Sequence, residues 1–171
     1  MAPMTFSHFD ETRDTVWWFD GFCGAGGASE GIERAGRIEI DGVVYQTNKV
    51  AVAVNHDERA IWAHNANHPN TMHLNTDIRL VDVADLARAL IRRGIYRLNI
   101  WWSAECTHFS NAKGGASRDA DSRMLSEELL RYVREFVANG IEIGWIMVEN
   151  VKEFFSWTSL LPKYKSGKRL K

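Results

Sequence analysis

Short apolar runs alternate along the chain with longer segments in which apolar residues recur at helical spacing. The predicted strands are residues 15–19, 50–54, a short segment before Asp77, 98–102 and 143–148. The predicted helices run up to about Gly36 after the first strand, and over 57–66, 83–93 and 122–138. Strands that alternate with helices in this way predict an α/β fold, a mostly parallel sheet with helices on both faces.

The segment between the first helix and the second strand departs from this alternation. Asp41-Gly42 lies between the short apolar stretches 38–40 and 43–45, and an Asp-Gly pair in that setting favours a two-residue hairpin turn. We therefore expect a peripheral hairpin insertion at about residues 37–49. The predicted organisation is an N-terminal extension over 1–14, one α/β domain over 15–161 and a basic tail over 162–171.

Composition narrows the class of protein without pointing to a partner. The chain has 171 residues, the usual size of one domain, and its 21 basic and 22 acidic residues leave a net charge of -1. It therefore lacks the overall positive field that attracts nucleic acid. No run approaches the roughly 20 apolar residues of a membrane span, and the start of the chain does not resemble a signal peptide. We expect a cytoplasmic protein without a membrane partner, whose Cys23 and Cys106 are free thiols.

A glycine-rich loop follows the first predicted strand, in the sequence Asp20-Gly21-Phe22-Cys23-Gly24-Ala25-Gly26-Gly27. Its glycines allow positive φ angles and close approach of a ligand, and the helix after it offers unpaired N–H groups to an anion. This arrangement favours a nucleotide-like cofactor. The NAD fingerprint requires glycine where Ser29 stands, which disfavours NAD. The alternative is a tight turn that binds nothing, with Cys23 as a packing residue.

Chemically useful residues follow the ends of the apolar runs. They are Asp20, Asn55, Asp77, Cys106 and Glu149. Because ligands of open α/β sheets bind at the carboxyl ends of the strands, these residues predict one shared crevice. The residue types alone leave two interpretations of Cys106, an activated nucleophile or a buried inert thiol. They leave two for Glu149 as well, a proton donor with a raised pKa or a helix cap.

Three motifs taken together resemble the cytosine-5 DNA methyltransferase family. Asp20 to Gly27 is similar to its first motif, Ser103 to Ser110 to its catalytic cysteine loop, and Glu149-Asn150-Val151 to its Glu-Asn-Val motif, in the same order and spacing. The resemblance covers about residues 16–154 and is strongest to phage and bacterial members. It implies the Rossmann-like fold of S-adenosylmethionine-dependent methyltransferases, truncated to the amino-terminal catalytic half. It also implies a restriction-modification role in a bacterial or phage-infected cell.

The activity implied by the resemblance is methyl transfer from S-adenosylmethionine to carbon 5 of cytosine in DNA. The implied catalytic residues are Cys106, whose thiolate adds to carbon 6, and Glu149, which protonates or hydrogen-bonds ring nitrogen 3. The target atom is inaccessible in stacked duplex DNA. The cytosine is therefore flipped into the crevice, at a cost of a few kcal/mol.

The resemblance also carries binding roles over to individual residues. The implied cofactor-binding residues are Asp20, Phe22, Cys23, Gly24, Gly26, Gly27, Ser29, Asn55, His56, Asp77, Ile78 and Leu125. The implied substrate-binding residues are Ser103, Glu105, Ser110 and Asn150. Some positions depart from the family pattern: Asn55 and His56 replace a ribose-binding acid and an adenine-stacking aromatic residue. Ala104 stands where related sequences have proline before the catalytic cysteine.

The family pattern continues beyond Glu149-Asn150-Val151 with an arginine motif and a target-recognition domain, so we expect a second polypeptide to supply them. One alternative is a remnant or module that binds S-adenosylmethionine or a partner without turnover. Another is an RNA cytosine methyltransferase.

A metal protein based on His64, His68 and His73 is the last alternative, because the first two lie one helical turn apart. Surface histidines on a helix are the preferred interpretation of these residues, and no metal is expected.

Overall fold

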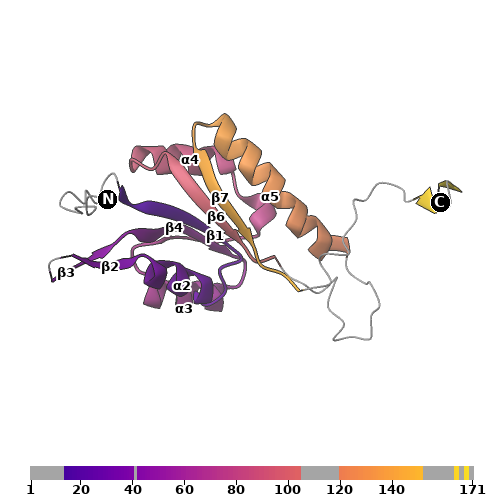
Figure 1. The fold of residues 1–171 in the computed structure, drawn as a ribbon. Coiled ribbons are helices and arrows are strands. Elements are labelled where there is room, and N and C mark those ends of the chain that lie inside the picture. Colours follow the sequence, from indigo (N-terminus) through magenta and orange to yellow (C-terminus); the bar gives the residue numbers. More distant parts are fainter. Residues whose placement is uncertain (1–13, 41, 105–119, 152–163, 166–167, 170–171) are drawn as a thin grey trace.

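The computed structural model of the chain describes residues 14–40, 42–104, 120–151, 164–165 and 168–169. Its centre is a five-stranded sheet in which every neighbouring pair of strands is parallel. The strands are β1 (Val16–Gly21), β4 (Asn48–Asn55), β5 (Met72–Asn75), β6 (Arg97–Trp102) and β7 (Glu142–Val148), in the spatial order β5-β4-β1-β6-β7 (Figure 1). From β1 the chain adds β4 and then β5 on one side. It then crosses back to form β6 and β7 on the other side of β1. The switch point of the sheet therefore lies between β1 and β6.

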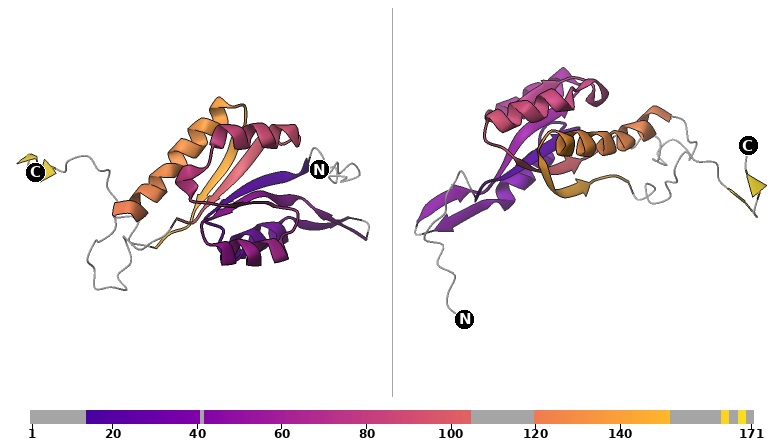
Figure 2. Two further views of the ribbon diagram at one scale, coloured as in Figure 1. Left: turned by 180° about the vertical axis from the view of Figure 1, so that it is seen from behind. Right: turned by 90° about the horizontal axis from the view of Figure 1, so that it is seen from above.

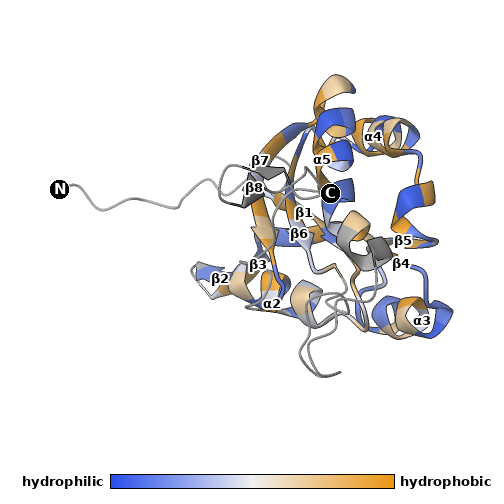
Figure 3. Ribbon diagram, turned by 90° about the vertical axis from the view of Figure 1, so that its right-hand side faces the viewer, coloured by the Kyte–Doolittle hydropathy of each residue, from blue (hydrophilic) through white to orange (hydrophobic). Residues whose placement is uncertain are grey.

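Helices cover both faces of this sheet. Helices α2 (Gly27–Ala35) and α3 (Glu58–Asn67) lie on one face, and α4 (Val83–Arg92) and α5 (Ala120–Ala138) lie on the other (Figure 1, Figure 2). A short 3-10 helix, η1 (Ile78–Leu80), precedes α4. Figure 3 shows both hydrophilic and hydrophobic segments on the helices, as expected for elements with one side on the sheet and one in solvent. The predicted Rossmann-like fold is confirmed.

The predicted hairpin insertion is an antiparallel pair of strands. It consists of β2 (Arg37–Ile40) and β3 (Val43–Gln46), and Gly42 in its turn has a φ of 78°. The pair projects away from the main sheet (Figure 2). Two further short strands, β8 (Tyr164–Lys165) and β9 (Lys168–Arg169), pair antiparallel within the predicted basic tail. Among the helices described in the chain, none is long and apolar enough to cross a membrane.

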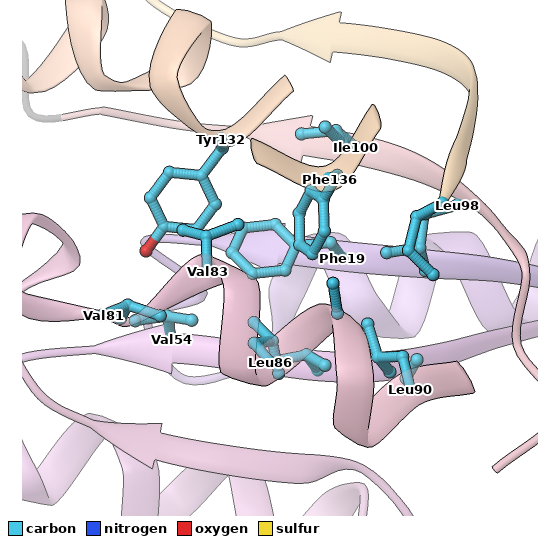
Figure 4. Close-up of a cluster of buried hydrophobic side chains, with 14 of the residues drawn as sticks. Phe19, Val54, Val81, Val83, Leu86, Leu90, Leu98, Ile100, Tyr132 and Phe136 are labelled. Atoms are coloured by element: carbon cyan, nitrogen blue, oxygen red, sulfur yellow. The ribbon is translucent and has the colours of Figure 1, made fainter. Parts of the chain in front are cut away.

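The larger apolar core lies between the sheet and helices α4 and α5 (Figure 4). Phe19 of β1 is fully buried there, with its ring 5.2 Å from that of Tyr132 and 5.9 Å from that of Phe136, both on α5. Leu86 and Leu90 of α4 belong to the same cluster. Burial of each such side chain contributes about 1.5–3 kcal/mol, so this core holds both helices firmly on the sheet.

The opposite face has a smaller apolar core beneath α2, formed by Trp18, Ile32 and Val50. Successive residues of a strand point to opposite faces, so β1 supplies Trp18 to this core and Phe19 to the larger one. The next β1 residue on the α2 face is Asp20, which is fully buried. This face therefore changes from apolar to polar toward the carboxyl end of β1.

A bulge fixes the pairing of β6 with β7. The register shifts between Leu98 and Ile100, so that Asn99 opposes two residues of β7, Gly144 and Trp145. Asn99 is buried, and its Oδ1 accepts a 2.8 Å hydrogen bond from the Trp145 backbone N–H. The side chain of Asn99 thus replaces a backbone partner in the ladder.

Strand β7 is one of the two edge strands of the described sheet, and after Glu142 its side chains are apolar on both faces. Its exposed apolar residues are Trp145, Ile146, Met147 and Val148. Strands of parallel sheets are normally buried on both faces. Part of β7 therefore lacks cover among the described residues.

The C-terminal end of α2 is closed by the residues that lead into β4. Thr47 donates hydrogen bonds from its backbone N–H and its Oγ1 to the Gly36 carbonyl, both at 2.8 Å, and Asn48 Nδ2 donates to the Ile32 carbonyl at 3.1 Å. The Thr47 donors satisfy a carbonyl that the helix end leaves unpaired, and Asn48 adds a second donor to the Ile32 carbonyl, which also accepts from the Gly36 N–H. The two segments lie so close that a Cβ on Gly36 would be 2.3 Å from the Asn48 backbone nitrogen.

We predict that Gly36→Ala destabilises the fold by about 2 kcal/mol or more, because the added methyl group overlaps a backbone atom that cannot rotate away. Gly31→Ala is the matched control. Gly31 lies within α2 with open space beside it, so its replacement stabilises the helix by about 0.5–1 kcal/mol. Urea denaturation followed by circular dichroism measures both free energies of unfolding. Equal effects of the two substitutions would contradict the close packing at Gly36.

Candidate functional site

The ends of β1, β6 and β7 are tied together by hydrogen bonds near the switch point. Ser103, which follows β6, donates from its backbone N–H to the Gly21 carbonyl at 3.2 Å. The Glu149 backbone N–H donates to the carbonyl of the last β6 residue at 3.0 Å, and Asn150 Nδ2 donates to the Ala104 carbonyl at 3.2 Å. The predicted residues Ser103, Glu149 and Asn150 thus lie at the same edge of the sheet as the glycine loop, and the Glu149 side chain is exposed.

The glycine loop holds three residues in the left-handed region of φ. They are Phe22 at 67°, Gly24 at 52° and Gly26 at 102°. Glycine adopts this conformation without strain, whereas Phe22 does so at a cost of about 1–3 kcal/mol. The Phe22 ring packs edge-on against Trp102, with the ring centroids 5.2 Å apart. Strained residues of this kind cluster at functional sites, so the loop is the first candidate for ligand binding.

Helix α2 begins directly after this loop. Its N-cap residue, Gly26, has no side chain that accepts a hydrogen bond from the first turn. A helix N-terminus presents N–H donors and a partial positive charge, so this end suits a carboxylate or phosphate. A Cβ at Gly24 or Gly27 would meet nothing within 4 Å, so a ligand has room to approach the backbone there. The predicted cofactor cradle lies at this loop, and its role in binding stays a prediction.

Four polar side chains form a hydrogen-bonded chain beneath the loop, which we call the Asp20–His73 relay. Ser29 Oγ donates to Asp20 Oδ2 at 2.7 Å. His64 Nε2 lies 2.9 Å from Ser29 Oγ, and His64 Nδ1 lies 2.8 Å from His73 Nε2. Asp20, Ser29 and His64 are fully buried. The relay therefore connects β1, the first turn of α2, α3 and β5.

Burial dominates the electrostatics around the relay. Burial raises the pKa of Asp20 from 3.8 to about 6, although the hydrogen bonds from Ser29 act to lower it. Asp20 Oδ1 has no hydrogen-bond partner among the described residues. Burial lowers the pKa of His64 to about 4, so this imidazole is neutral near pH 7. Burial also raises the pKa of the Cys23 thiol to about 12, so Cys23 is a packing residue rather than a nucleophile.

Other predicted cofactor residues follow the ends of β4 and β5. Asn55 ends β4, where its Oδ1 accepts a hydrogen bond from the Asp57 N–H at 2.9 Å, and His56 beside it is exposed. Asp77, two residues after β5, accepts hydrogen bonds from the guanidinium and the backbone N–H of Arg79. These hydrogen bonds from Arg79 lower the pKa of Asp77 to about 2, so its side chain is a carboxylate near neutral pH.

Two predicted cofactor residues pack into the larger core. Ile78 is buried, and its carbonyl accepts a 2.8 Å hydrogen bond from the Tyr132 hydroxyl. Leu125 of α5 is half-buried against the same core. The predicted residues Glu105, Cys106 and Ser110 lie outside the described residues. The placement of the catalytic cysteine therefore stays a prediction.

Two of the three histidines are buried, so their interpretation as surface residues is wrong. His64 of α3 is fully buried and His68, which caps the C-terminal end of α3, is 4% exposed, because both side chains lie against α2 rather than in solvent. His68 Nδ1 pairs with Glu33 Oε2 at 3.0 Å, as His64 pairs with Ser29. The sequence carries no local signal for this inward face, since each pair is separated by 35 positions along the chain.

A different trio comes within metal-ligand distance in the described part of the chain. The ligand atoms of Glu30, Glu33 and His68 lie within 4.8 Å of one another. These side chains already pair with protein groups, His68 with Glu33 and Glu30 with Arg34. We assign no metal to them.

Comparison with solved structures finds methyltransferases. An E. coli prophage protein assigned as a DNA modification methyltransferase is 25% identical with a TM-score of 0.61, and the match covers 82% of this chain and 33% of that protein. A mutant of DNMT2 from Spodoptera frugiperda is 19% identical with a TM-score of 0.52, and the match covers 84% of this chain and 38% of that protein. Neither protein-family models nor curated proteins give a match.

These similarities confirm the predicted methyltransferase fold and support the resemblance on which it was based. The first of them rests on sequence identity as well as on shape. The chain spans about one third of the length of each of these structures.

We predict that Asp20 makes the stability of the protein depend on pH. Because its pKa of about 6 in the folded protein lies above the ordinary 3.8, protonation of Asp20 favours the folded state. This contribution is complete below about pH 4, is lost as the pH rises through about 6, and amounts to a change on the order of 3 kcal/mol.

The measurement is the free energy of unfolding of the parent relative to that of Asp20→Asn, by urea denaturation at several pH values. We expect this difference to increase in favour of the parent between about pH 7 and about pH 4. A difference that does not change with pH would contradict the burial of the Asp20 carboxyl group.

Proposed function

We propose that this chain, whose structure is cytosine-5 DNA methyltransferase-like, is the donor-binding and catalytic half of a DNA methyltransferase. The reaction is transfer of a methyl group from S-adenosylmethionine to carbon 5 of cytosine. The observation that carries the proposal is the position of the strained glycine loop at the switch point, beside the two strand ends that precede the other motifs. The end of β6 leads toward Cys106, and Glu149 follows β7 at the same edge.

The residues at this edge fit S-adenosylmethionine. The N–H groups in the first turn of α2 suit the carboxylate of the donor, and the open backbone at Gly24 and Gly27 leaves room for its methionine part beside Phe22. Asn55 and His56 at the end of β4 suit the ribose and the adenine, by hydrogen bonding and by stacking. When bound, the donor supplies an electrophilic methyl group on a sulfonium sulfur.

Cys106 and Glu149 carry the chemistry in this proposal. Carbon 5 of cytosine is a poor nucleophile, so the Cys106 thiolate first adds to carbon 6 of the ring. Glu149, which is exposed after β7, donates a proton or a hydrogen bond to ring nitrogen 3 and makes carbon 5 electron-rich. After methylation a base removes the proton from carbon 5, the carbon–sulfur bond breaks, and the ring double bond forms again.

The proposal includes a second polypeptide, or a further part of a longer chain, that supplies target recognition and covers β7. The matches cover 33% and 38% of the similar structures, so each of those proteins is more than twice as long as this chain. Trp145 of β7 is 69% exposed and Met147 is 44% exposed, at the edge of the described sheet. Exposed apolar residues gathered on one strand mark an interaction site. The DNA, with its target cytosine flipped out, then binds between the two parts.

We predict that Cys106→Ser abolishes methyl transfer while the chain still binds S-adenosylmethionine, because a serine hydroxyl is too weak a nucleophile to form the adduct at carbon 6. Incorporation of tritiated methyl groups into cytosine-containing DNA and, in parallel, RNA measures the reaction, with and without a polypeptide that supplies the target-recognition part. Parent-level transfer by Cys106→Ser would contradict the mechanism. Transfer to RNA alone would indicate an RNA methyltransferase, and donor binding without any transfer would indicate a binding module.

Glu149→Ala is expected to reduce methyl transfer on the order of a hundredfold or more, because nitrogen 3 loses its proton donor. Glu142→Ala is the matched control, since Glu142 begins the same strand, is exposed, and pairs only loosely with Arg97 at 3.4 Å. Both variants are expected to bind S-adenosylmethionine like the parent. Equal transfer rates for the two variants would rule out the role given to Glu149.

A further inference from the structure

We propose that His64 and His73 are positioning residues for the methyl donor, which hold the glycine loop and the first turn of α2 in place through Ser29 and Asp20. The proposal rests on the proposed function, because it concerns the same donor site. It gives a role to two histidines that lie outside the three sequence motifs.

Hydrogen-bond chemistry gives the Asp20–His73 relay one direction when Asp20 is ionised. A carboxylate only accepts hydrogen bonds, so the Ser29 hydroxyl donates its single proton to Asp20. The Ser29 oxygen then accepts from the Nε2–H of His64, whose Nδ1 is unprotonated in the neutral imidazole. His64 Nδ1 accepts in turn from the Nε2–H of His73. With Asp20 ionised, His64 therefore has one tautomer that satisfies both of its neighbours in the relay, so loss of His64 breaks the relay in its middle.

His64 of α3 and His68 at its C-terminal cap also support the loop by direct contact. A Cβ on Gly26 would lie 2.9 Å from His68 Nε2 and 3.3 Å from His64 Cδ2, so Gly26 rests on both rings. The Gly26 N–H donates to the Cys23 carbonyl at 3.0 Å and closes the turn of the loop. A shift of His64 therefore moves Gly26 by contact and the first turn of α2 through Ser29.

The charged groups around the relay are compatible with this proton arrangement. His68 pairs with Glu33, and the charge of His68 lowers the pKa of Asp20 while that of Glu149 raises it. Burial lowers the pKa of both His64 and His73. Near neutral pH the two histidines of the relay are thus uncharged, as the sequence of donors and acceptors requires.

Binding of S-adenosylmethionine to the full chain, measured by isothermal titration calorimetry, tests the proposal. We expect His64→Leu to weaken binding on the order of tenfold, because Ser29 loses its donor. His64→Gln, whose amide nitrogen replaces Nε2, is expected to stay within about threefold of the parent. Thr71→Val is the matched control, because it leaves the Thr71 backbone beside His73 in place and removes only a buried hydroxyl, which donates to the Val50 carbonyl and to no side chain of the relay; it is expected to bind like the parent.

A double-mutant cycle separates positioning from general destabilisation. If His64 acts through Ser29, His64→Leu has little further effect on affinity in a Ser29→Ala background, whereas it keeps its full effect in a Thr71→Val background. Additive losses from His64→Leu and Ser29→Ala would overturn the proposal. Unchanged affinity in His64→Leu would overturn it as well, and would leave the proposed function intact.

Nitrogen NMR of the imidazole rings tests the relay in the parent chain without any ligand. At about pH 8 Asp20 is ionised, and we expect His64 to carry its proton on Nε2. A proton on Nδ1 of His64 would overturn the relay even in a chain that binds the donor. A parent chain with the expected tautomer that binds no S-adenosylmethionine would instead contradict the donor site of the proposed function, and the positioning role with it.

Discussion

The hydrogen bond between Ser29 and Asp20 joins the two ends of the glycine loop. Asp20 lies near the end of β1 and Ser29 in the first turn of α2, so the bond sets the distance that the residues between them must span. A short segment with fixed ends has few conformations. This explains why even Phe22 is held at positive φ, and why the start of α2 is directed along the edge where the strands end.

The two faces of the sheet are stabilised by different interactions. Rings around Phe19 hold α4 and α5 by apolar burial, whereas the carboxyl-terminal part of the α2 face is held by the Asp20–His73 relay. Burial of Asp20 is unfavourable for its charged form, so the relay contributes less to stability than an apolar core of the same size. What it contributes is a single arrangement of the loop on a rigid scaffold.

The strands and helices are predictable because their apolar periodicity is local, and parallel order then brings Asp20, Asn55 and Glu149 to one edge. Side-chain partners distant in sequence are not predictable in this way. The burial of His64 depends on Ser29, and α3 is too polar for its inward face to be recognised from apolar spacing. The bulge at Asn99 likewise depends on a second strand. For Cys106, which lies outside the described residues, the sequence motif is still the sole guide.

The exposed strand β7 has a consequence for the handling of the protein. Residues 143–148 are apolar apart from one glycine, contain no charge or proline, and lie at a sheet edge. Uncharged β-forming segments at an edge can pair with the same segment of a second copy, so among the described residues this strand is the predicted site of aggregation. Co-expression with a polypeptide that covers β7 would then improve the solubility of the chain as well as complete the catalytic site.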